Sequence, residues 1–600
     1  MLNPDDRSLY TGAVTPPPGY LFDQAVATTY SLDLATVLSL PTHIALAERP
    51  SSAAIDPIKL LESLRRLSGR FSVYVDHAGI KSPSGSNVLF GLLESMVIPT
   101  KAPRGGVFHP KMWVLRFVQP EIDEPPLIRL LILSRNITYD RSWDISLQLE
   151  GRPGRRYVAA NRPLGEFLSS LPTISTQPVE KERKVQIDRL ADDLRKTVWE
   201  LPEGFEEVAF HIIGNKRKAW SPSWSRRMAV ISPFITDEAL SWLSDQTEEL
   251  VAVVSRPDEL NQIRTETLQL ADKWFTLDEA AETEDGEEPD KQDTVGLHAK
   301  VYVAEKGWWT RLYLGSANAT STALLQCNNS EVLVELVGRT SRVGGIETLL
   351  SENGLGPILA EYTQPDELAP VDDEEASARK ALEKARNLLA NAKLKLTCEA
   401  DGDAWRLSLV STEPLSISGM SGFKAWPITV SKDRAKDVFD LTRYGFAEIG
   451  RYATESVTGL VAFEFVSVIR KLSLRMVLNI PIEGLPENRD DAIFKLVLNN
   501  REGFLRYILL LLGEYTGGFL NKSGLFNTGN GSGSWTEGFT NEVPILEELA
   551  RAFSRSPDKL KDVKAVVNRL MRDEDSKSIV PKEFIEFWKV FEIAMEEADK

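Results

Sequence analysis

The stretch LHAKVYVAEKGWWTRLYLGSANAT, residues 297 to 320, is the part of the sequence that decides the fold. It begins with His298 and Lys300 at the start of one apolar run. A second apolar run ends in Ser316 and Asn318. Alternating apolar runs of this length predict two neighbouring strands. Because residues i and i+2 of a strand point to the same face, His298 and Lys300 are expected to share one space, which Asn318 joins from the next strand.

The same pattern occurs earlier in the chain. The run VFHPKMWVLRF carries His109 and Lys111, and the next apolar run ends in Ser134 and Asn136. One His-x-Lys has little weight, but two copies that are each followed by Ser-x-Asn indicate an internal duplication. Strand-like and helix-like runs alternate around both copies, which predicts an α/β fold with two lobes. A duplication of this kind lets two half-sites face each other across a pseudo-twofold axis.

Two such half-sites suit a phosphodiester substrate. One imidazole can attack phosphorus and the other can protonate the leaving oxygen, while lysines and asparagines hold the non-bridging oxygens. The histidines must then start in different protonation states, so carboxylates that orient them are expected. Asp144 and Glu331 are the candidates, and a simple surface position remains the alternative for each. The predicted catalytic residues are His109, Lys111, Asn136, His298, Lys300 and Asn318, supported by Ser134, Ser316, Asp144 and Glu331.

These paired motifs resemble those of the phospholipase D superfamily, His-x-Lys followed by a Gly-Ser-x-Asn strand. The later copy is a close match, whereas the earlier copy has Leu133 in place of the glycine. The superfamily's aspartate five positions after the lysine is replaced by Arg116 and by Glu305, as in the tyrosyl-DNA phosphodiesterase branch. The resemblance covers about residues 20 to 361. It implies a metal-independent reaction through a phosphohistidine, with the N-terminal histidine as nucleophile and the C-terminal one as acid and base.

Bulk composition limits the kind of protein. A chain of 600 residues with 42% apolar residues, 26% charged residues and only two cysteines is expected to be a soluble protein of a reducing compartment, the cytoplasm. We expect no membrane span, no cofactor and no metal site. The predicted domains are residues 1–185 and 186–370, two phospholipase D-like lobes; residues 371–484, a linking helix and a small β-rich domain; and residues 485–600, a helical C-terminal domain, the last two forming an α+β region.

Nucleic acid is the expected substrate, although the net charge of -17 argues against binding by overall charge alone. One segment, GNKRKAWSPSWSRR, mixes cations with flat rings, the two ingredients of a single-strand track. The alternative is a solvated loop whose tryptophans pack inward. An acidic stretch, residues 277 to 293, is hypothesised to cover the basic groove, with an exposed solubilising loop as its alternative. The predicted nucleic-acid-binding residues are Lys216, Arg217, Lys218, Trp220, Trp224, Arg226 and Arg227.

The sequence therefore predicts a nuclease that acts on DNA in preference to RNA. By resemblance, it is expected to be the nuclease component of a bacterial defence or restriction system. No GxxxxGK[ST] loop is found, so a separate helicase or ATPase subunit is the expected partner, and homo-oligomerisation stays open. A phospholipid or small phosphodiester hydrolase is one alternative. A catalytically silent nucleic-acid-binding module is the other.

Overall fold

The computed structural model describes residues 10–46, 56–120, 122–139, 142–214, 220–278, 296–365, 372–413, 415–513, 545–555, 557–572 and 579–598. Two compact units are present. The first unit comprises residues 1–50, 66–452 and 458–484, and it contains every predicted catalytic residue. The second unit comprises residues 51–65, 453–457 and 485–600.

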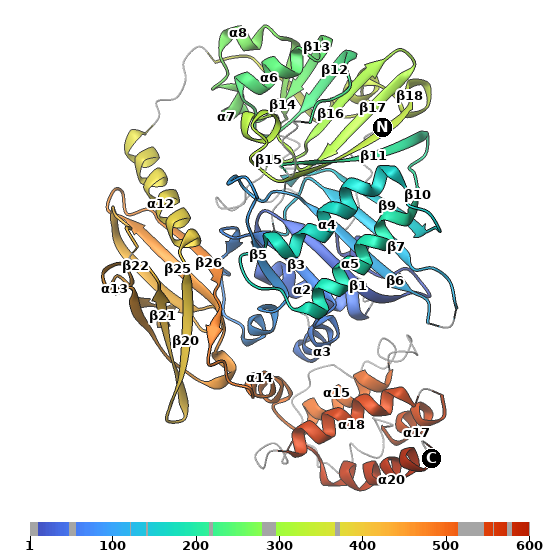
Figure 1. Cartoon of the computed structure of the whole chain (residues 1–600), viewed down its shortest axis with the longest axis vertical. Coiled ribbons are helices and arrows are strands. Elements are labelled where there is room, and N and C mark those ends of the chain that lie inside the picture. Colours follow the sequence, from blue (N-terminus) through green and yellow to red (C-terminus); the bar gives the residue numbers. More distant parts are fainter. Residues whose placement is uncertain are drawn as a thin grey trace. The chain divides into compact units, whose positions relative to one another are not determined.

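A seven-stranded sheet forms the first half of the first unit (Figure 1). Its central strands are buried along their whole length, which explains why they read as continuous apolar runs in the sequence. Helices α4 (Arg162–Ile174) and α5 (Lys181–Lys196) pack against it. The strand order is β10 (Thr197–Glu200), β9 (Ser146–Pro153), β7 (Leu127–Leu133), β6 (Met112–Val118), β1 (Leu21–Thr29), β3 (Phe71–Asp76) and β5 (Val97–Thr100).

An eight-stranded sheet forms the second half of this unit. The strand order is β11 (Phe205–Ile213), β18 (Glu331–Arg339), β17 (Trp309–Gly315), β16 (Val301–Lys306), β12 (Ser225–Ile231), β13 (Thr247–Val254), β14 (Ala271–Leu277) and β19 (Leu359–Glu361). Shorter helices flank it: α6 (Asp237–Ser244), α7 (Pro257–Leu260), α8 (Thr265–Leu268), α10 (Thr340–Val343) and α11 (Ile346–Leu350).

The two sheets repeat one topology. The run β18-β17-β16-β12-β13-β14 has the same order and the same strand directions as β9-β7-β6-β1-β3-β5, with two parallel pairs at one end and antiparallel pairs at the other. One buried apolar cluster contains residues of both sheets, such as Leu130 and Leu314. The α/β class and the duplication predicted from the sequence are therefore confirmed, while a pseudo-twofold axis between the halves stays a prediction.

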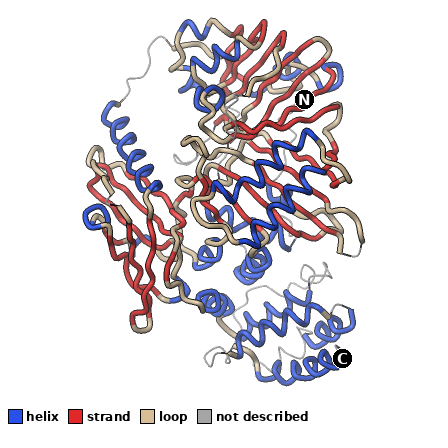
Figure 2. Tube along the Cα trace, in the orientation of Figure 1, coloured by secondary structure: helices blue, strands red, loops and turns tan. Residues whose placement is uncertain are grey.

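A third sheet joins the C-terminal part of this unit to its beginning. Its order is β2 (Leu32–Asp33), β4 (Ile80–Lys81), β26 (Ser473–Asn479), β25 (Leu460–Ser467), β22 (Met420–Pro427) and β23 (Lys436–Asp437). The joining pair is Ile80 with Val477. A smaller sheet consists of β24 (Phe446–Tyr452), β21 (Ala404–Ser411), β20 (Leu394–Asp401) and β27 (Ile482–Glu483). Helix α12 (Asp373–Asn391) precedes β20 in the sequence and packs on β25 and β26 of the third sheet (Figure 2).

The strands and the helix expected between residues 372 and 484 are thus present. The entry of β2 and β4 into this region was not predicted, and the proposed domain boundaries stay predictions. The remaining helices of the first unit are α1 (Tyr10–Val14), α2 (Leu34–Leu46) and α13 (Asp440–Tyr444).

The described part of the second unit is helical. Its helices are α14 (Arg489–Leu498), α15 (Arg501–Gly513), α17 (Ile545–Arg555), α18 (Asp558–Met571) and α20 (Lys582–Ala598), with most of α3 (Pro57–Leu67). Within it, the Tyr507 hydroxyl is hydrogen bonded to Glu62. None of the helices in the described ranges has the length and apolar character that crossing a lipid bilayer requires.

Candidate active site

The first half-site is built where β6 begins. The residue before His109, Phe108, donates its backbone N–H to the Asp76 carboxylate at 2.9 Å. His109 donates its own N–H to the carbonyl oxygen of Ser330, a residue of the other half, at 2.9 Å. Lys111 is 1% exposed, and its Nζ donates to the His109 carbonyl at 3.1 Å. Histidine and lysine are therefore fixed together, as the i, i+2 spacing predicts.

The second half-site has the same construction at the start of β16. His298 donates its N–H to the carbonyl oxygen of Trp143 at 2.8 Å. Lys300 is 2% exposed, and its Nζ donates to the His298 carbonyl at 2.6 Å. Trp143 lies in β8 (Ser142–Trp143), which pairs with β15 (Gly296–Leu297) just before His298. The backbone of each histidine is thus held by the opposite half.

The two candidate carboxylates also cross between the halves. His109 Nδ1 lies 2.8 Å from Oε2 of Glu331, whereas His298 Nδ1 lies 3.8 Å from Oδ1 of Asp144, longer than a hydrogen bond. The serines hold these acids: Ser316 donates to Glu331 at 2.5 Å, and Ser134 donates to Asp144 at 2.8 Å. Glu331 is 1% exposed, which excludes the surface position left open for it. Each acid therefore faces the histidine of the other half, and Glu331 orients His109 by a hydrogen bond.

The two asparagines differ in their partners. Asn136 accepts a hydrogen bond from the backbone N–H of Ser31 at 3.3 Å. The side-chain oxygen of Asn318 is buried and has no hydrogen-bond partner among the described residues. A buried amide without a partner is costly in a folded chain, so the Asn318 amide is a group that a polar ligand can satisfy.

Two buried lysines, one from each half, carry the charge of the space between the halves. Burial lowers the pKa of Lys111 well below its usual value, and the charge of Lys300 lowers it further. Burial likewise lowers the pKa of Lys300 to about 8, against the opposing effect of Asp144 and Glu331. The charge of Lys300 opposes that of Lys111, so an anion bound between the two lysines would stabilise both ammonium forms.

Both histidines are kept neutral at pH 7. Burial lowers the pKa of His109, although Glu331 raises it. Burial also lowers the pKa of His298 to about 2, and the charges of Lys300 and Arg256 add to the effect. The expectation that the histidines start in different protonation states is therefore not met in this structure. They differ instead in orientation: the Nδ1–H of His109 is held by Glu331, which directs the lone pair of Nε2 away from the acid.

Sequence reasoning missed several residues around the site. The ring centroid of Tyr30 lies 5.2 Å from that of His109, and the Arg256 Nε donates to the Leu297 carbonyl at 2.9 Å. Tyr30 directly follows β1, Asp76 ends β3, and Arg256 lies two residues after the end of β13 (Thr247–Val254). The carboxyl ends of parallel strands are where α/β sheets place their functional residues, so this position in the sequence was the available signal.

The positions that replace the superfamily's aspartate are occupied by internal ion pairs. Arg116 is bound to Asp23 at 2.5 Å and to Asp193 at 2.8 Å. Glu305 accepts from the Ile346 N–H at 2.6 Å. Neither side chain is paired with a catalytic histidine or lysine, so both positions stabilise the fold instead.

Of the two tryptophans in the predicted nucleic-acid track, one packs inward and one is exposed. Trp220 is 8% exposed and packs on Trp242, Tyr302 and Tyr313, which is the inward packing named as the alternative. Trp224 is 47% exposed, with the Lys306 ammonium 5.1 Å from its ring centroid. Lys216, Arg217 and Lys218, and residues 279 to 293 of the acidic stretch, lie outside the described residues.

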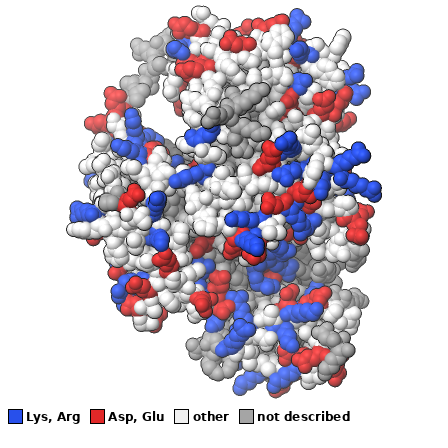
Figure 3. Space-filling model, in the orientation of Figure 1, with Lys and Arg blue, Asp and Glu red and all other residues white. Residues whose placement is uncertain are grey.

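The two arginines of that segment lie at the wrong end of a strand. Arg226 and Arg227 are near the start of β12, where Arg227 pairs with Glu305 across the sheet. The end of β12 near the site is Ile231, opposite Val301, so Arg227 is about 13 Å away along the strand. Ion pairs with Glu248 and Glu249 occupy both arginines. On the face drawn in Figure 3, basic and acidic side chains are interspersed.

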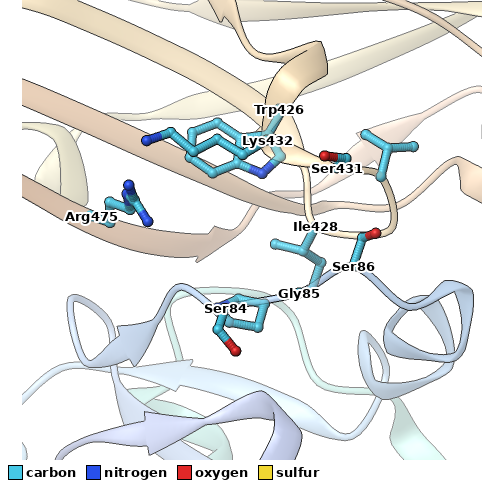
Figure 4. Close-up of a pocket in the computed structure, with 10 residues that line it drawn as sticks. Ser84, Gly85, Ser86, Trp426, Ile428, Ser431, Lys432 and Arg475 are labelled. Atoms are coloured by element: carbon cyan, nitrogen blue, oxygen red, sulfur yellow. The ribbon is translucent and has the colours of Figure 1, made fainter. Parts of the chain in front are cut away.

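A separate cavity of about 250 Å³ lies between the loop Pro83–Ser86 and the third sheet (Figure 4). Trp426 forms part of its wall, and Lys432 and Arg475 line it. Both cations bind the same oxygen of Glu464 at 2.7 Å, so their charge is partly neutralised. In the described ranges, no three His, Cys, Asp or Glu side chains are grouped as a metal site requires.

The sequence matches no family model and no curated protein. The structure is similar to that of the yeast tyrosyl-DNA phosphodiesterase, with 10% identity, 55% of this chain and 85% of that chain covered, and a TM-score of 0.35. It is also similar to a phosphatidylserine synthase from Haemophilus influenzae, with 11% identity, 63% and 91% covered, and a TM-score of 0.33. Both are members of the phospholipase D superfamily, the one that the motifs resemble. At these TM-scores the similarity carries no functional weight of its own.

Proposed function

We propose that this chain is a phospholipase D-like phosphodiesterase that acts through a phosphohistidine, and that its substrate is nucleic acid. The observation that carries the proposal is the convergence of two His-x-Lys pairs from the two halves of the duplication. Each pair brings a buried lysine, and each histidine faces a carboxylate of the other half. This arrangement suits a phosphodiester, since it combines a nucleophile, a proton donor and two cations around one phosphate.

The first step forms the phosphohistidine. Nε2 of His109 attacks phosphorus while its Nδ1–H remains bound to Glu331, which stabilises the imidazolium as positive charge develops. The bond from phosphorus to the leaving oxygen breaks, and this oxygen takes a proton from His298. Lys111 and Lys300 hold the non-bridging oxygens throughout. His109 is the assigned nucleophile because its tautomer is fixed by a hydrogen bond and that of His298 is not.

His298 must carry a proton in that step, yet its pKa is lowered to about 2 in this structure. Burial is the largest cause, and the neighbouring charges of Lys300, Arg256 and Lys111 add to it. A bound phosphodiester places a negative charge between these cations, which raises the pKa of His298 toward its usual value. Substrate binding therefore prepares the acid. In the second step, His298 takes a proton from water, the water oxygen attacks phosphorus, and the P–N bond breaks to free His109 and a phosphomonoester.

Paired rings and cations on both sides of the site favour nucleic acid over a lipid headgroup. Tyr30 has Lys111 5.9 Å from its ring centroid, and Phe234 has Arg256 at 4.9 Å. Flat rings with cations suit bases and phosphates. We further propose that the protein acts on DNA in preference to RNA and that it acts in the cytoplasm. Its role would be that of the nuclease in a bacterial defence or restriction system, with a separate helicase or ATPase subunit. The resemblance of the motifs supports this wider role.

The test is cleavage of end-labelled single- and double-stranded DNA and RNA in excess EDTA. Wild type would be compared with His109→Ala, His298→Ala and the control Lys306→Met, an exposed lysine at the far end of β16. We expect repeated turnover by wild type and by the control, no cleavage by His109→Ala, and at most a single, slow turnover by His298→Ala. Activity that persists in both histidine variants would exclude this site.

The nucleophile is tested separately with phosphorus-labelled substrate. In His298→Ala the second step is slow, so label is expected to accumulate on His109 as an acid-labile adduct. Label on the protein that survives the further substitution His109→Ala would contradict the assignment. Hydrolysis of phospholipid vesicles with no cleavage of any nucleic acid would favour the lipid alternative. Binding of nucleic acid without turnover of any diester would favour the silent module.

A further inference from the structure

Three residues that the proposed mechanism does not use lie on the first-half side of the site. Tyr30, which directly follows β1, is half-buried, and its ring lies 5.2 Å from that of His109. Arg386 of α12 donates from Nη2 to the Tyr30 hydroxyl at 3.4 Å. Lys101 directly follows β5. A residue from the C-terminal third thus reaches the side chain that packs on the assigned nucleophile.

Arg386 has unused capacity to donate hydrogen bonds. Among the described residues, it forms an ion pair with Glu383 alone, at 3.1 Å, and Glu383 is half-exposed on the same helix. Such a surface pair contributes little. The Nε of Arg386 is buried and has no hydrogen-bond partner in the described part of the chain. A buried guanidinium N–H without a partner is costly, so an anionic ligand at this place would be stabilised.

Lys101 brings a second cation to the same place. Its charge and that of Arg386 both lower the pKa of His77, after the larger effect of burial. His77 follows Asp76, the acid that holds the residue before His109. Within the described residues, Lys101 forms no ion pair. The His77 N–H donates to the carbonyl of Thr100, the residue before Lys101, at 3.0 Å. Lys101 and Arg386 thus both lie near His77, and Arg386 also contacts Tyr30, on the side of the site that carries His109.

The helix that carries Arg386 is firmly placed. The residues Ala378, Leu382, Ala385 and Leu389 recur at helical spacing and are buried. This face packs on β25 and β26, and β26 pairs with β4, the strand that closely follows His77. Arg386 is therefore held at the site by the third sheet.

We propose that Tyr30, Lys101 and Arg386 form a subsite for the nucleotide next to the scissile phosphate. Arg386 and Lys101 bind the neighbouring backbone phosphate, and Tyr30 offers its ring to the base. The subsite rests on the proposed function, because only a polymer has a second phosphate there. It gives the C-terminal third a role in binding a nucleic-acid strand.

The test measures binding of a fluorescent single-stranded octanucleotide by anisotropy, at several salt concentrations, in a His109→Ala background that prevents cleavage. We expect Arg386→Gln and Lys101→Gln each to raise Kd about tenfold. Each should also lower the slope of log K against log salt by about 0.7, the value for one lost contact to a single strand. The matched controls on the same helix, Arg379→Gln and Lys384→Gln, should change neither quantity, since both side chains are exposed.

The ring is tested with Tyr30→Leu and Tyr30→Phe. Stacking predicts that leucine weakens binding about tenfold and that phenylalanine, which keeps the ring, weakens it much less. Melting curves confirm that each variant is folded.

Several outcomes would overturn the subsite. If Arg386→Gln and Lys101→Gln leave Kd and the salt slope unchanged while wild type cleaves the oligonucleotide, the subsite is wrong and the proposed function stands. Equal losses in Arg386→Gln and Arg379→Gln would mean a general charge effect, which also excludes it. If wild type hydrolyses bis(4-nitrophenyl) phosphate but does not bind the oligonucleotide, the subsite and the nucleic-acid assignment both fail, while the diester chemistry remains.

Discussion

His109 and Glu331 are 222 residues apart in the sequence, and their side chains are joined by a contact of 2.8 Å between Nδ1 and Oε2. The corresponding pair, His298 and Asp144, is separated by 3.8 Å. Each half of the duplication therefore supplies the acid that faces the histidine of the other half. Only the contact of Glu331 with His109 is a hydrogen bond. This asymmetry distinguishes a nucleophile with a fixed tautomer from a histidine that can gain and lose a proton.

Glu331→Gln should lower kcat about 100-fold, because the amide no longer stabilises the charge that develops on His109. Asp144→Asn should have a smaller effect, since its contact with His298 is longer than a hydrogen bond. Steady-state kinetics on the cleaved diester would measure both. The reverse order of effects would contradict the assignment of His109 as the residue held by its acid.

The activity should fall as the pH rises through about 8. Lys300 binds phosphate as the ammonium, and burial lowers its pKa to about 8, so its charge is lost on the alkaline side of that value. A profile of log kcat/KM from pH 6 to 10 would show the fall. Lys300→Arg, with a guanidinium that stays charged, should lower activity but extend the plateau to higher pH. A wild-type profile that stays flat to pH 10 would exclude Lys300 as the titrating group.

The folded protein should lose stability as the pH falls below about 6.5. Both catalytic histidines have pKa values below the usual 6.5 when folded, so in this range the unfolded chain binds more protons than the folded chain. The stability is fully present above pH 6.5, and each histidine removes up to ~1.4 kcal/mol per pH unit below it. Denaturant melts at pH 7 and pH 5 would measure the loss. It should be smaller in the double variant His109→Asn, His298→Asn; an equal loss would contradict the prediction.

Lys300→Met should abolish activity and raise the melting temperature at pH 7. The lowered pKa of Lys300 means that its charged form is disfavoured by burial, and methionine fills a similar volume without a charge. We expect a gain of about 2 kcal/mol, of the size that a shift of this kind implies. Lys306→Met, at the exposed end of the same strand, should change neither quantity. A lower melting temperature in Lys300→Met would show that the attraction of Lys300 to Asp144 and Glu331 stabilises the fold by more than the burial of its charge destabilises it.

The sequence was sufficient for the catalytic groups because their chemistry is encoded over short distances. The i, i+2 spacing of His-x-Lys places its side chains by strand geometry alone, and the structure brings both His-Lys pairs to the junction of the two halves. The catalytic roles of these residues and of Asn136 and Asn318 stay predictions. The pairing of Glu331 with His109 depends on how the halves meet, and no local pattern contains that information. The prediction that Trp220 binds nucleic acid was wrong for a related reason. Composition cannot distinguish an aromatic ring on a basic loop from one that is buried in the core.

The pairing of Ile80 with Val477 also limits how this protein can have arisen. The two-residue strand β4 pairs with β2 on one side and with β26 on the other, and it closely follows Asp76 and His77. An ancestor that possessed only the duplicated halves would have exposed this edge of β4 to water. The C-terminal third therefore supplies a strand that the first half of the duplication uses. We expect homologues that lack this third to carry a different segment against β4.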